Sequence, residues 1–502
     1  MAESQLKELT QKAAAAVHPG FPPPNNIRPG GVDPLGLRQI NFDLMDQVLP
    51  GLNNVARHIR PFVVVSWAWR RAAAIAKGRR AKEIEVDKLA DFVDRIEVIY
   101  AWSQFQINSD ADLPGRQVLG SILQSKVYRF AGANWERQRK ARRDSTAFTA
   151  AINYGPGLKN LGWVLPHEKY PRVLIPTEII SNALDAFEAK ISNFLTHPAF
   201  SKFGPVSVTS EDIYAWAKVW ALENPTSAER KIAKQILWGE FAPNARRSGI
   251  ELILATAQDS GEVSEAKVRR KMCGPPSRFL PPKELMNVAK DWRRLQVRQV
   301  FRLTLESFFY WIMEQLTDGP RSTTTLVSRF LSQSIVRGQR ASAGTWLNSL
   351  QDVSMGPVEL LDRLDSSLAS GDLGKLAQSI VAGLSFCLSE PTSDGKIFER
   401  PDRLPLTRAV SEFERVKDLP PAAFVKHVIE SWVLAQHAYW SIGRGLADAR
   451  QRGKAILRLR VSLEDGGWEL TPGAVPPRPF PTPDRLQTVL NLAQECGALP
   501  KM

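Results

Sequence analysis

Hydrophobic side chains recur every three or four residues along most of the chain after residue 35, which is the spacing of one helix face. Leu89, Phe92 and Ile96 follow this spacing and predict an amphipathic helix. Thr226, with Glu229 three residues later, forms a capping box that predicts the start of another helix. The first of these helices is predicted over residues 85–105, and further helices are predicted over residues 37–48, 61–77, 145–152, 180–194 and 285–316.

Two segments have the alternating pattern or the composition of β-strands. In residues 456–470, Val461 and Leu463 alternate with polar side chains, and residues 465–467 (Asp-Gly-Gly) supply a turn. This segment predicts a β-hairpin. Residues 170–176 predict a short extended segment, which their two prolines restrict to a sheet edge or a loop.

A final helix is predicted after the hairpin, with Thr482 and Pro483 at its start and Gly497 at its end. A long helix, the hairpin and this helix would form a winged-helix-like element. The predicted fold class is therefore mostly α, a multi-lobed helical protein with one small C-terminal β element. We expect a flexible leader and four further parts, over residues 1–30, 31–165, 166–280, 281–400 and 401–502.

The charge of the chain favours an anionic partner. Lysine and arginine number 66 against 52 aspartates and glutamates, which gives a net charge of +14 over 502 residues. Such a balance is typical of nucleic-acid binding, although it does not determine a fold. Glu3, Lys7 and Glu8 stand where a signal peptide would be apolar, and no apolar stretch is long enough for a membrane span. We therefore expect a cytoplasmic protein that has no membrane partner.

Motifs for metal binding and catalysis are missing from the sequence. The six histidines do not have the spacing of a metal site, and three cysteines are too few for a Cys-based metal cluster or a disulfide framework. Residues 154–162 are glycine-rich but lack the phosphate-loop pattern, so a turn is predicted there. We expect no cofactor, no metal and no catalytic residues. Cys273, Cys387 and Cys496 are interpreted as buried free thiols.

One acidic motif keeps an enzymatic alternative open. Asp185, Glu188 and Lys190 match the D…E-x-K string of metal-dependent nucleases. A nuclease centre would need these residues on adjacent strands, whereas the surrounding hydrophobic spacing is helical. The simpler interpretation is a charged, solvent-facing side of a helix, because the pattern places Asp185 and Glu188 away from the apolar face.

Four acid-poor segments carry most of the candidate binding residues, namely residues 47–82, 134–143, 319–351 and 450–460. Arginine forks are suited to phosphate oxygens, and Trp135 could stack on a base. The alternative is that these cations lie on solvated helix faces, paired with acids or capping helix ends. The candidate nucleic-acid-binding residues are Arg57, Arg60, Arg70, Arg71, Trp135, Arg137, Arg139, Lys140, Arg142, Arg143, Arg337, Arg340, Arg458 and Arg460.

Several motifs in the first third of the chain resemble a group of large bacterial proteins of unknown function, which are often encoded beside anti-phage or restriction genes. The resemblance covers residues 32–165. The motifs are Val-Asp-Pro-Leu-Gly at 32–36, residues 49–62, Ser-Trp-Ala-Trp at 66–69, Trp135 with its arginines, and Tyr-Gly-Pro-Gly-Leu at 154–158. The resemblance implies a subunit that works beside other proteins of a defence locus, and it implies no catalytic residues.

The sequence thus predicts a non-enzymatic nucleic-acid-binding or scaffolding subunit of a bacterial multi-protein complex. Two alternatives remain open. One is a metal-dependent nuclease with dispersed carboxylates. The other is a pure protein-interaction module, in which aromatic residues such as those at 308–311 would form an interface.

Overall fold

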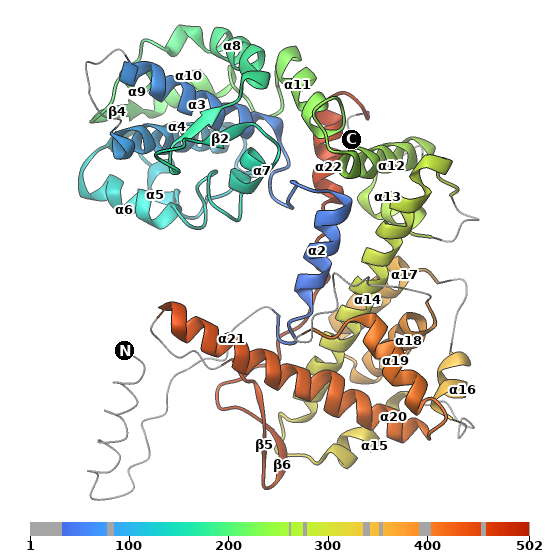
Figure 1. Ribbon diagram of the computed structural model, residues 1–502. Helices are drawn as coiled ribbons and strands as arrows, with labels where there is room; N and C mark the ends of the chain where they lie inside the picture. Colours follow the sequence, from blue (N-terminus) through green and yellow to red (C-terminus); the bar gives the residue numbers. More distant parts are fainter. Residues whose placement is uncertain are drawn as a thin grey trace, which may run out of the picture. The chain divides into compact units, whose positions relative to one another are not determined.

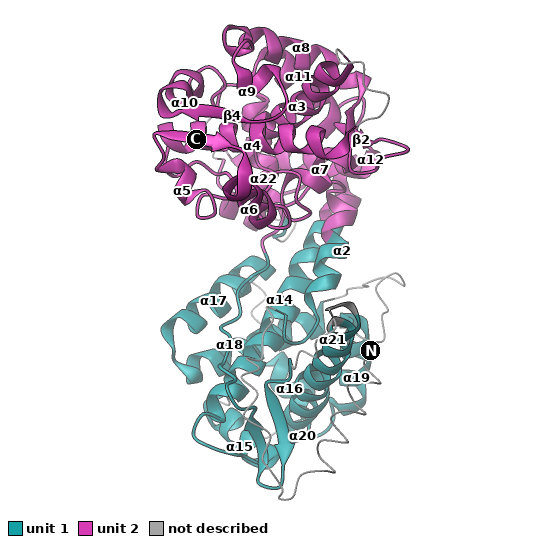
Figure 2. Ribbon diagram, turned by 90° about the vertical axis from the view of Figure 1, so that its left-hand side faces the viewer, with its two compact units in different colours: residues 1–44, 273–275, 290–482 teal, residues 45–272, 276–289, 483–502 magenta. Residues whose placement is uncertain are grey.

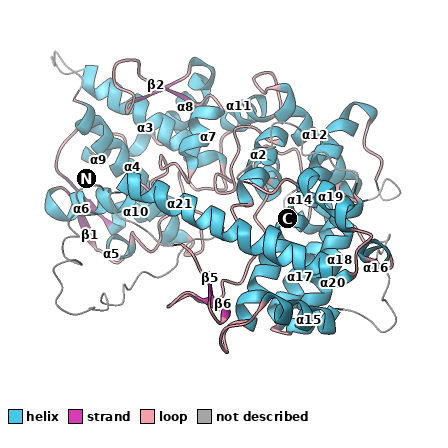
Figure 3. Cartoon of the chain, turned by 60° about the horizontal axis from the view of Figure 1, so that its bottom comes forward, coloured by secondary structure: helices cyan, strands magenta, loops and turns pink. Residues whose placement is uncertain are grey.

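The structure is a computed structural model that describes residues 33–77, 85–260, 263–274, 279–334, 342–350, 355–390, 403–452 and 458–500. Within these ranges the protein is mostly α-helical, and its strands form three two-stranded antiparallel sheets (Figures 1 and 3). The predicted fold class, mostly α with a small C-terminal hairpin, is confirmed. None of the helices in these ranges is long and apolar enough to cross a lipid bilayer.

The chain divides into two compact units, each assembled from segments far apart in the sequence (Figure 2). Unit 1 contains residues 1–44, 273–275 and 290–482, and unit 2 contains residues 45–272, 276–289 and 483–502. The divisions near residues 165 and 400 that the sequence favoured therefore fall inside a unit.

Unit 1 is organised around most of helix α14 (Met286–Gln315), which is buried on nearly all sides from Leu295 onward. Phe308 and Trp311 are fully buried in its core, so the aromatic run at 308–311 fills the interior of the unit. The other elements of unit 1 are α15 (Thr323–Ser334), α16 (Ala343–Asn348), α17 (Pro357–Ser370), α18 (Leu373–Ser389), α19 (Leu406–Val416), α20 (Pro421–His427), a π-helical segment (Val428–Ala435), α21 (Gln436–Arg452), β5 (Val461–Glu464) and β6 (Gly467–Leu470), with the first turns of α2 (Arg38–Val48).

Unit 2 has a core in which helices α3 (Ile59–Lys77) and α4 (Val86–Ile107) pack side by side. Its final helix, α22 (Leu486–Glu495), packs on α12 (Asn244–Ser260) and α13 (Glu265–Met272). The remaining elements are α5 (Gly120–Leu123), β1 (Val127–Phe130), α6 (Gly132–Arg142), α7 (Tyr154–Asn160), β2 (Val164–Pro166), β3 (Leu174–Pro176), η1 (Glu178–Ile180), α8 (Ser181–Lys190), η2 (Ser192–Phe194), α9 (Pro198–Ser201), β4 (Val206–Thr209), α10 (Ser210–Ala217), α11 (Ser227–Leu237) and η3 (Lys283–Leu285).

Helices predicted from long periodic patterns are confirmed. The segments predicted at 61–77, 85–105 and 285–316 correspond to α3, α4 and α14. The capping box is also present, because the Thr226 hydroxyl accepts a hydrogen bond from the Glu229 backbone N–H at 3.2 Å, and Glu229 accepts one from the Thr226 N–H. Sustained apolar spacing together with a cap therefore predicted these elements correctly.

Two local predictions around residue 150 are wrong. Residues 145–152 form turns and bends instead of a helix. Most of the glycine-rich segment predicted as a turn is helix α7, and only residues 161–162 form a turn, where Gly162 has a φ of +78°. The glycines serve close packing: a Cβ on Gly155 would lie 2.2 Å from the Thr149 carbonyl oxygen, and one on Gly157 would lie 3.0 Å from Phe62. Composition alone could not distinguish this use of glycine from a turn.

The β elements agree with the sequence only in part. The strand predicted at 170–176 is β3, which pairs with β2, and the hairpin at 461–470 is β5–β6. The paired strands β1 and β4 were not predicted from the sequence. Leu463, predicted on the apolar side of the hairpin, is 62% exposed, and the last helix begins at Leu486 instead of Pro483.

Candidate anion-binding site

A four-residue segment, Asp33-Pro34-Leu35-Gly36, is bound along helix α21 in unit 1. Each of its four carbonyl oxygens accepts a hydrogen bond from a side chain. The donors, in the order of the carbonyls, are Trp440, His437, Gln436 and Arg403. Because every carbonyl of this irregular segment has a donor, three side chains of α21 and the side chain of Arg403 define its position.

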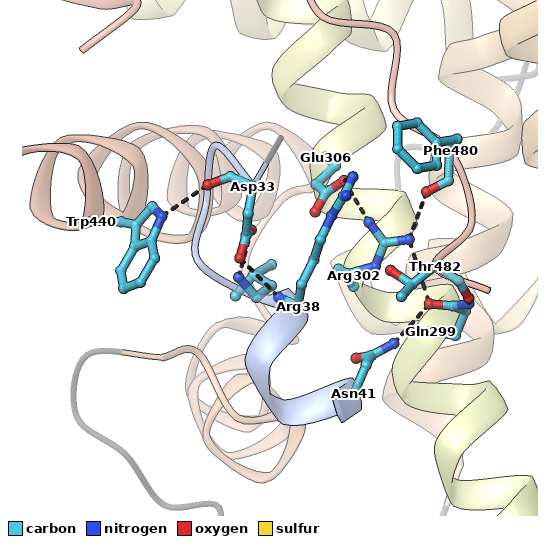
Figure 4. A network of polar contacts seen from close by, with 10 residues as sticks. Asp33, Arg38, Asn41, Gln299, Arg302, Glu306, Trp440, Phe480 and Thr482 are labelled. Atoms are coloured by element: carbon cyan, nitrogen blue, oxygen red, sulfur yellow. Dashed lines mark hydrogen bonds and ion pairs between the residues drawn. The ribbon is translucent and has the colours of Figure 1, made fainter. Parts of the chain in front are cut away.

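Gly36 is required by the close approach of this segment to α21. Its φ of +72° lies in the left-handed region, and a Cβ would lie 2.4 Å from a ring atom of Trp440. The guanidinium carbon of Arg403 lies 4.1 Å from the Trp440 ring centroid, which is a cation–π geometry. Trp440 is therefore fixed by Gly36, Arg403 and the Asp33 carbonyl together (Figure 4 shows its contact with Asp33).

The Asp33 side chain serves the start of helix α2. Its two carboxylate oxygens accept hydrogen bonds from the backbone N–H groups of Leu37, at 3.0 Å, and Arg38, at 3.3 Å. A carboxylate at this position also interacts favourably with the helix dipole. Burial, and then the negative charge of Glu306, raise the pKa of Asp33 above its ordinary value.

Beside this segment lies a pocket of about 360 Å³, called the arginine pocket below. Five arginines line it, and Asp33 is the single acidic side chain among its described lining residues. The arginines come from four places in the sequence: Arg38 in α2, Arg403 before α19, Arg444 in α21, and Arg458 and Arg460 before β5. Arg458 and Arg460 were predicted as binding residues from the sequence, and the fold brings them to one site with three arginines that were not.

Arg38 connects the arginine pocket to a buried polar network (Figure 4). Its Nη2 lies 3.5 Å from Glu306 Oε2, which Arg302 Nη1 approaches to 2.6 Å. Glu306 and Arg302 belong to helix α14 and have fully buried side chains. Arg302 also donates to the Phe480 carbonyl at 2.9 Å, and Gln299 accepts a hydrogen bond from Asn41 at 2.7 Å. The network fixes the start of α2 against α14 within unit 1.

Arg460 is held by its backbone and by its side chain. Its N–H donates to His437 Nε2 at 2.9 Å, and its guanidinium donates to the Val475 carbonyl at 3.2 Å. Burial lowers the pKa of Arg460, but an arginine guanidinium keeps its proton in proteins. His437 thus bonds to Pro34 through one ring nitrogen and to Arg460 through the other, so it joins two walls of the pocket.

The chemistry of the arginine pocket is that of a receptor for a phosphate or carboxylate group. Each guanidinium has five N–H donors in a fixed, planar fork. Planar arginine forks bind phosphate oxygens in pairs with strong, charge-assisted hydrogen bonds. Across the described ranges, no three His, Cys, Asp or Glu side chains are grouped in a way that could hold a metal ion.

Three candidate residues of unit 2 are buried, and their assignment to nucleic-acid binding is corrected. Arg60 is fully buried in an ion pair with Glu229 at 3.1 Å. Trp135 is 1% exposed and donates to Asp91 at 2.6 Å, so its ring is not available to a base. Arg142 is 2% exposed. These side chains stabilise the interior of the unit.

Trp135 and Arg142 belong to a row of contacts between helices α6 and α4. On α4 the row consists of Asp91, Asp94 and Glu97, three residues apart, which face Trp135, Arg139 and Arg142 on α6. Arg139 Nε lies 2.7 Å from Asp94, and Arg142 Nη2 lies 3.3 Å from Glu97. Burial raises the pKa of Glu97 to about 7 against the opposing effect of Arg142. We call this row the α4–α6 ladder.

Arg57, Arg70 and Arg71 are also engaged in ion pairs within unit 2. Arg57 lies 3.3 Å from Asp112, while Arg70 and Arg71 contact Glu188 at 2.9 and 3.5 Å. Glu188 also accepts a hydrogen bond from the Trp67 indole at 3.1 Å. Glu188, on helix α8, is therefore held by three side chains of α3.

Three cations of α6 and its end point to solvent. Arg137, Lys140 and Arg143 are exposed, and they are spaced by three residues. Within the described part of the chain, these three cations form no ion pair. Arg337 and Arg340 lie outside the described residues.

Four residues of the site were not predicted from the sequence, namely Arg38, Arg403, Arg444 and Trp440. Three of these are isolated cations in mixed sequence, so no charge cluster marked them. The signal that was present is the Asp-Pro-Leu-Gly motif at 33–36, which the structure explains as the segment bound to α21.

Comparison with known proteins does not extend this picture. No protein-family model, no curated protein and no solved structure matches the chain.

Proposed function

We propose that the protein binds nucleic acid through phosphate contacts, as a non-enzymatic subunit of a cytoplasmic bacterial complex. The observation that carries the proposal is the arginine pocket, which gathers five guanidinium groups from four parts of unit 1. Arginine forks match the geometry of phosphate groups, and the net charge of +14 favours a polyanion over a small neutral ligand.

A second surface supports the same proposal. Arg137, Lys140 and Arg143 form an exposed basic row on unit 2, while the neighbouring Arg139 and Arg142 are used inside the α4–α6 ladder. Exposed cations spaced along one helix face suit contacts with a phosphate backbone. The setting in a defence-associated complex follows from the resemblance of residues 32–165 to bacterial proteins of such loci.

The experiment is a binding titration of the full chain with fluorescent single-stranded and duplex oligonucleotides between about 50 and 200 mM salt. The logarithm of the affinity is expected to fall linearly with the logarithm of the salt concentration, by about 0.7 per phosphate contact on single strands and about 0.9 on duplex. Absence of binding at the lowest salt would overturn the proposal.

Charge-reversal variants assign the binding to a surface. Arg444→Glu together with Arg458→Glu is expected to weaken binding at least about tenfold and to reduce the salt slope by about one to two. Arg415→Glu, an exposed arginine of α19 that does not line the arginine pocket, is the matched control. Equal binding by the double variant and the control would remove the arginine pocket as the site.

A further inference from the structure

A second hollow adjoins the arginine pocket and differs from it in chemistry. It has a volume of about 590 Å³ and shares Arg403, Trp440 and Arg444 with the arginine pocket. Its other lining residues belong to α21 and include Tyr439, Ile442 and Leu446. Cationic and apolar surfaces therefore meet along one helix.

The apolar side of this hollow is unusually exposed. Tyr439 is 60% exposed, Ile442 54% and Leu446 57%, and they follow one another at steps of three and four on one face of α21. Consecutive exposed apolar side chains on a soluble surface are typical of a binding site. Gly443 lies among them with open space where a Cβ would be, so a flat ring can approach the helix backbone closely.

The depth of the arginine pocket restricts the kind of phosphate that can reach its arginines. Arg38, Arg403 and Arg460 are 8%, 7% and 6% exposed, so much of each side chain lies below the surface. A phosphate within a strand is esterified on two sides and carries one charge. A terminal phosphate is esterified once and carries a charge of about −1.5 to −2 at neutral pH, with three oxygens to accept hydrogen bonds.

We propose that the two hollows together bind the phosphorylated end of a single nucleic-acid strand. The terminal phosphate occupies the arginine pocket, and the terminal base lies against Tyr439 and Ile442. This inference rests on the proposed function and specifies its ligand. A single strand fits because its last base is free to stack on an aromatic side chain, whereas the last base of a blunt duplex is already paired and stacked.

The test compares oligonucleotides of one sequence that carry a 5′-phosphate, a 3′-phosphate or only hydroxyl ends, each bound to the full chain at fixed salt. One of the two phosphorylated strands is expected to bind at least about tenfold more tightly than the hydroxyl strand, as two or more new charge-assisted hydrogen bonds would give. Which strand binds more tightly gives the polarity. The corresponding blunt duplex is expected to lose this advantage.

Variants distinguish the contribution of the arginine pocket to binding from that of the second hollow. Arg444→Ala and Arg458→Ala, singly, are expected to reduce the preference for the phosphorylated end, whereas Arg415→Ala leaves it unchanged. Tyr439→Ala is expected to reduce the preference for a single strand over a blunt duplex while the response to the phosphate persists. Tyr214→Ala in unit 2 is the matched control, because Tyr214 is 58% exposed. Circular dichroism spectra identical to that of the parent protein establish that each variant is folded.

Different binding results would overturn the end-binding inference and the proposed function. Equal affinity for all three strands, with binding still sensitive to Arg444→Glu and Arg458→Glu, would overturn the end-binding inference alone. Absence of binding to every oligonucleotide at low salt would overturn both. Retention of the end preference in the Arg444→Ala and Arg458→Ala variants would exclude the arginine pocket as the place where the phosphate binds.

Discussion

His437 is a neutral bridge in the wall of the arginine pocket. The Pro34 carbonyl, 2.8 Å away, can only accept, so Nδ1 of His437 carries the proton and donates. Nε2 then accepts the Arg460 N–H, which a doubly protonated ring could not do. Burial lowers the pKa of His437 to about 4, and the nearby Arg460 charge acts in the same direction. The ring also lies against Phe309, with centroids 4.3 Å apart.

This bridge predicts a pH dependence of stability. Between the unfolded pKa of 6.5 and the folded pKa of about 4, the unfolded chain binds a proton at His437 that the folded chain does not. The contribution is therefore fully present above pH 6.5 and decreases as the pH falls toward 4, by about 3 kcal/mol in all. Urea unfolding of the parent protein and of His437→Gln at several pH values measures the difference between them. His427→Gln is the control, and parallel curves for parent and His437→Gln would contradict the prediction.

Gly36 allows a second test at the scale of one residue. Gly36→Ala combines a left-handed backbone with a clash against Trp440, whereas Gly371, at φ +69°, has open space around its Cβ position. Gly371→Ala is expected to cost about 1–2 kcal/mol from backbone strain alone. Gly36→Ala is expected to cost about 1–3 kcal/mol more, as overpacking does. Equal losses in the free energy of unfolding would show that the approach of Gly36 to Trp440 is not tight.

Helices α4 and α6 illustrate how a run of cations can belong to the interior. Within residues 134–143, the spacing of Trp135, Arg139 and Arg142 directs these three side chains to the acids of α4, while the intervening cations face solvent. Glu97, the buried acid of the α4–α6 ladder, has lost water and is compensated by Arg142 on α6. Removing one partner is therefore more harmful than removing an exposed cation next to it.

Adjacent arginines provide the matched pair for this prediction. Arg142→Met leaves the Glu97 carboxylate buried and unpaired, and is expected to destabilise unit 2 by about 3–5 kcal/mol. Arg143→Met changes an exposed side chain and is expected to stay within about 0.5 kcal/mol. Chemical denaturation followed by tryptophan fluorescence measures both. A loss of stability of similar size in the two variants would contradict the buried role of Arg142.

Elements defined by long apolar spacing could be predicted from the sequence, and short elements could not. Helix α14 has a periodic pattern over thirty residues, whereas β1 and β4 have four residues each and pair only because the fold brings Val127 opposite Thr209.

At the candidate site, Arg458 and Arg460 could be predicted because they belong to a cluster of cations in the sequence, whereas the isolated Arg403 could not. A charge run also does not reveal burial, so Arg60 and Arg142 were assigned to the surface. The burial of Arg142 could have been predicted from the spacing of the acids at 91, 94 and 97, which matches the spacing of the α6 residues that they contact.

The whole chain forms two cores whose segments alternate along the sequence. The core of unit 1 draws on Leu35 and Leu37 as well as on residues from 297 to 461, and unit 2 is completed by residues 483–502. Helix α22 is tied into unit 2 by polar contacts as well as by packing. Glu495 lies 2.6 Å from His58 Nδ1 and accepts the Ile59 N–H at 2.8 Å, and the Thr488 hydroxyl donates to the Asn53 carbonyl at 2.9 Å.

This organisation predicts that loss of the end of the chain affects the unit formed mostly by its first half. Removing residues 486–502 removes α22, which packs on α12 and α13 and carries the buried Leu486, Val489 and Leu490. It leaves the core residues of unit 1 in place. Hydrogen exchange is therefore expected to accelerate in α12 and α13 and to stay slow in α18, because local stability follows the apolar contacts around each element. Truncation after Leu499 is the control and is expected to change neither region. Equal acceleration in α13 and α18 would mean that one cooperative core, and not two, holds the chain together.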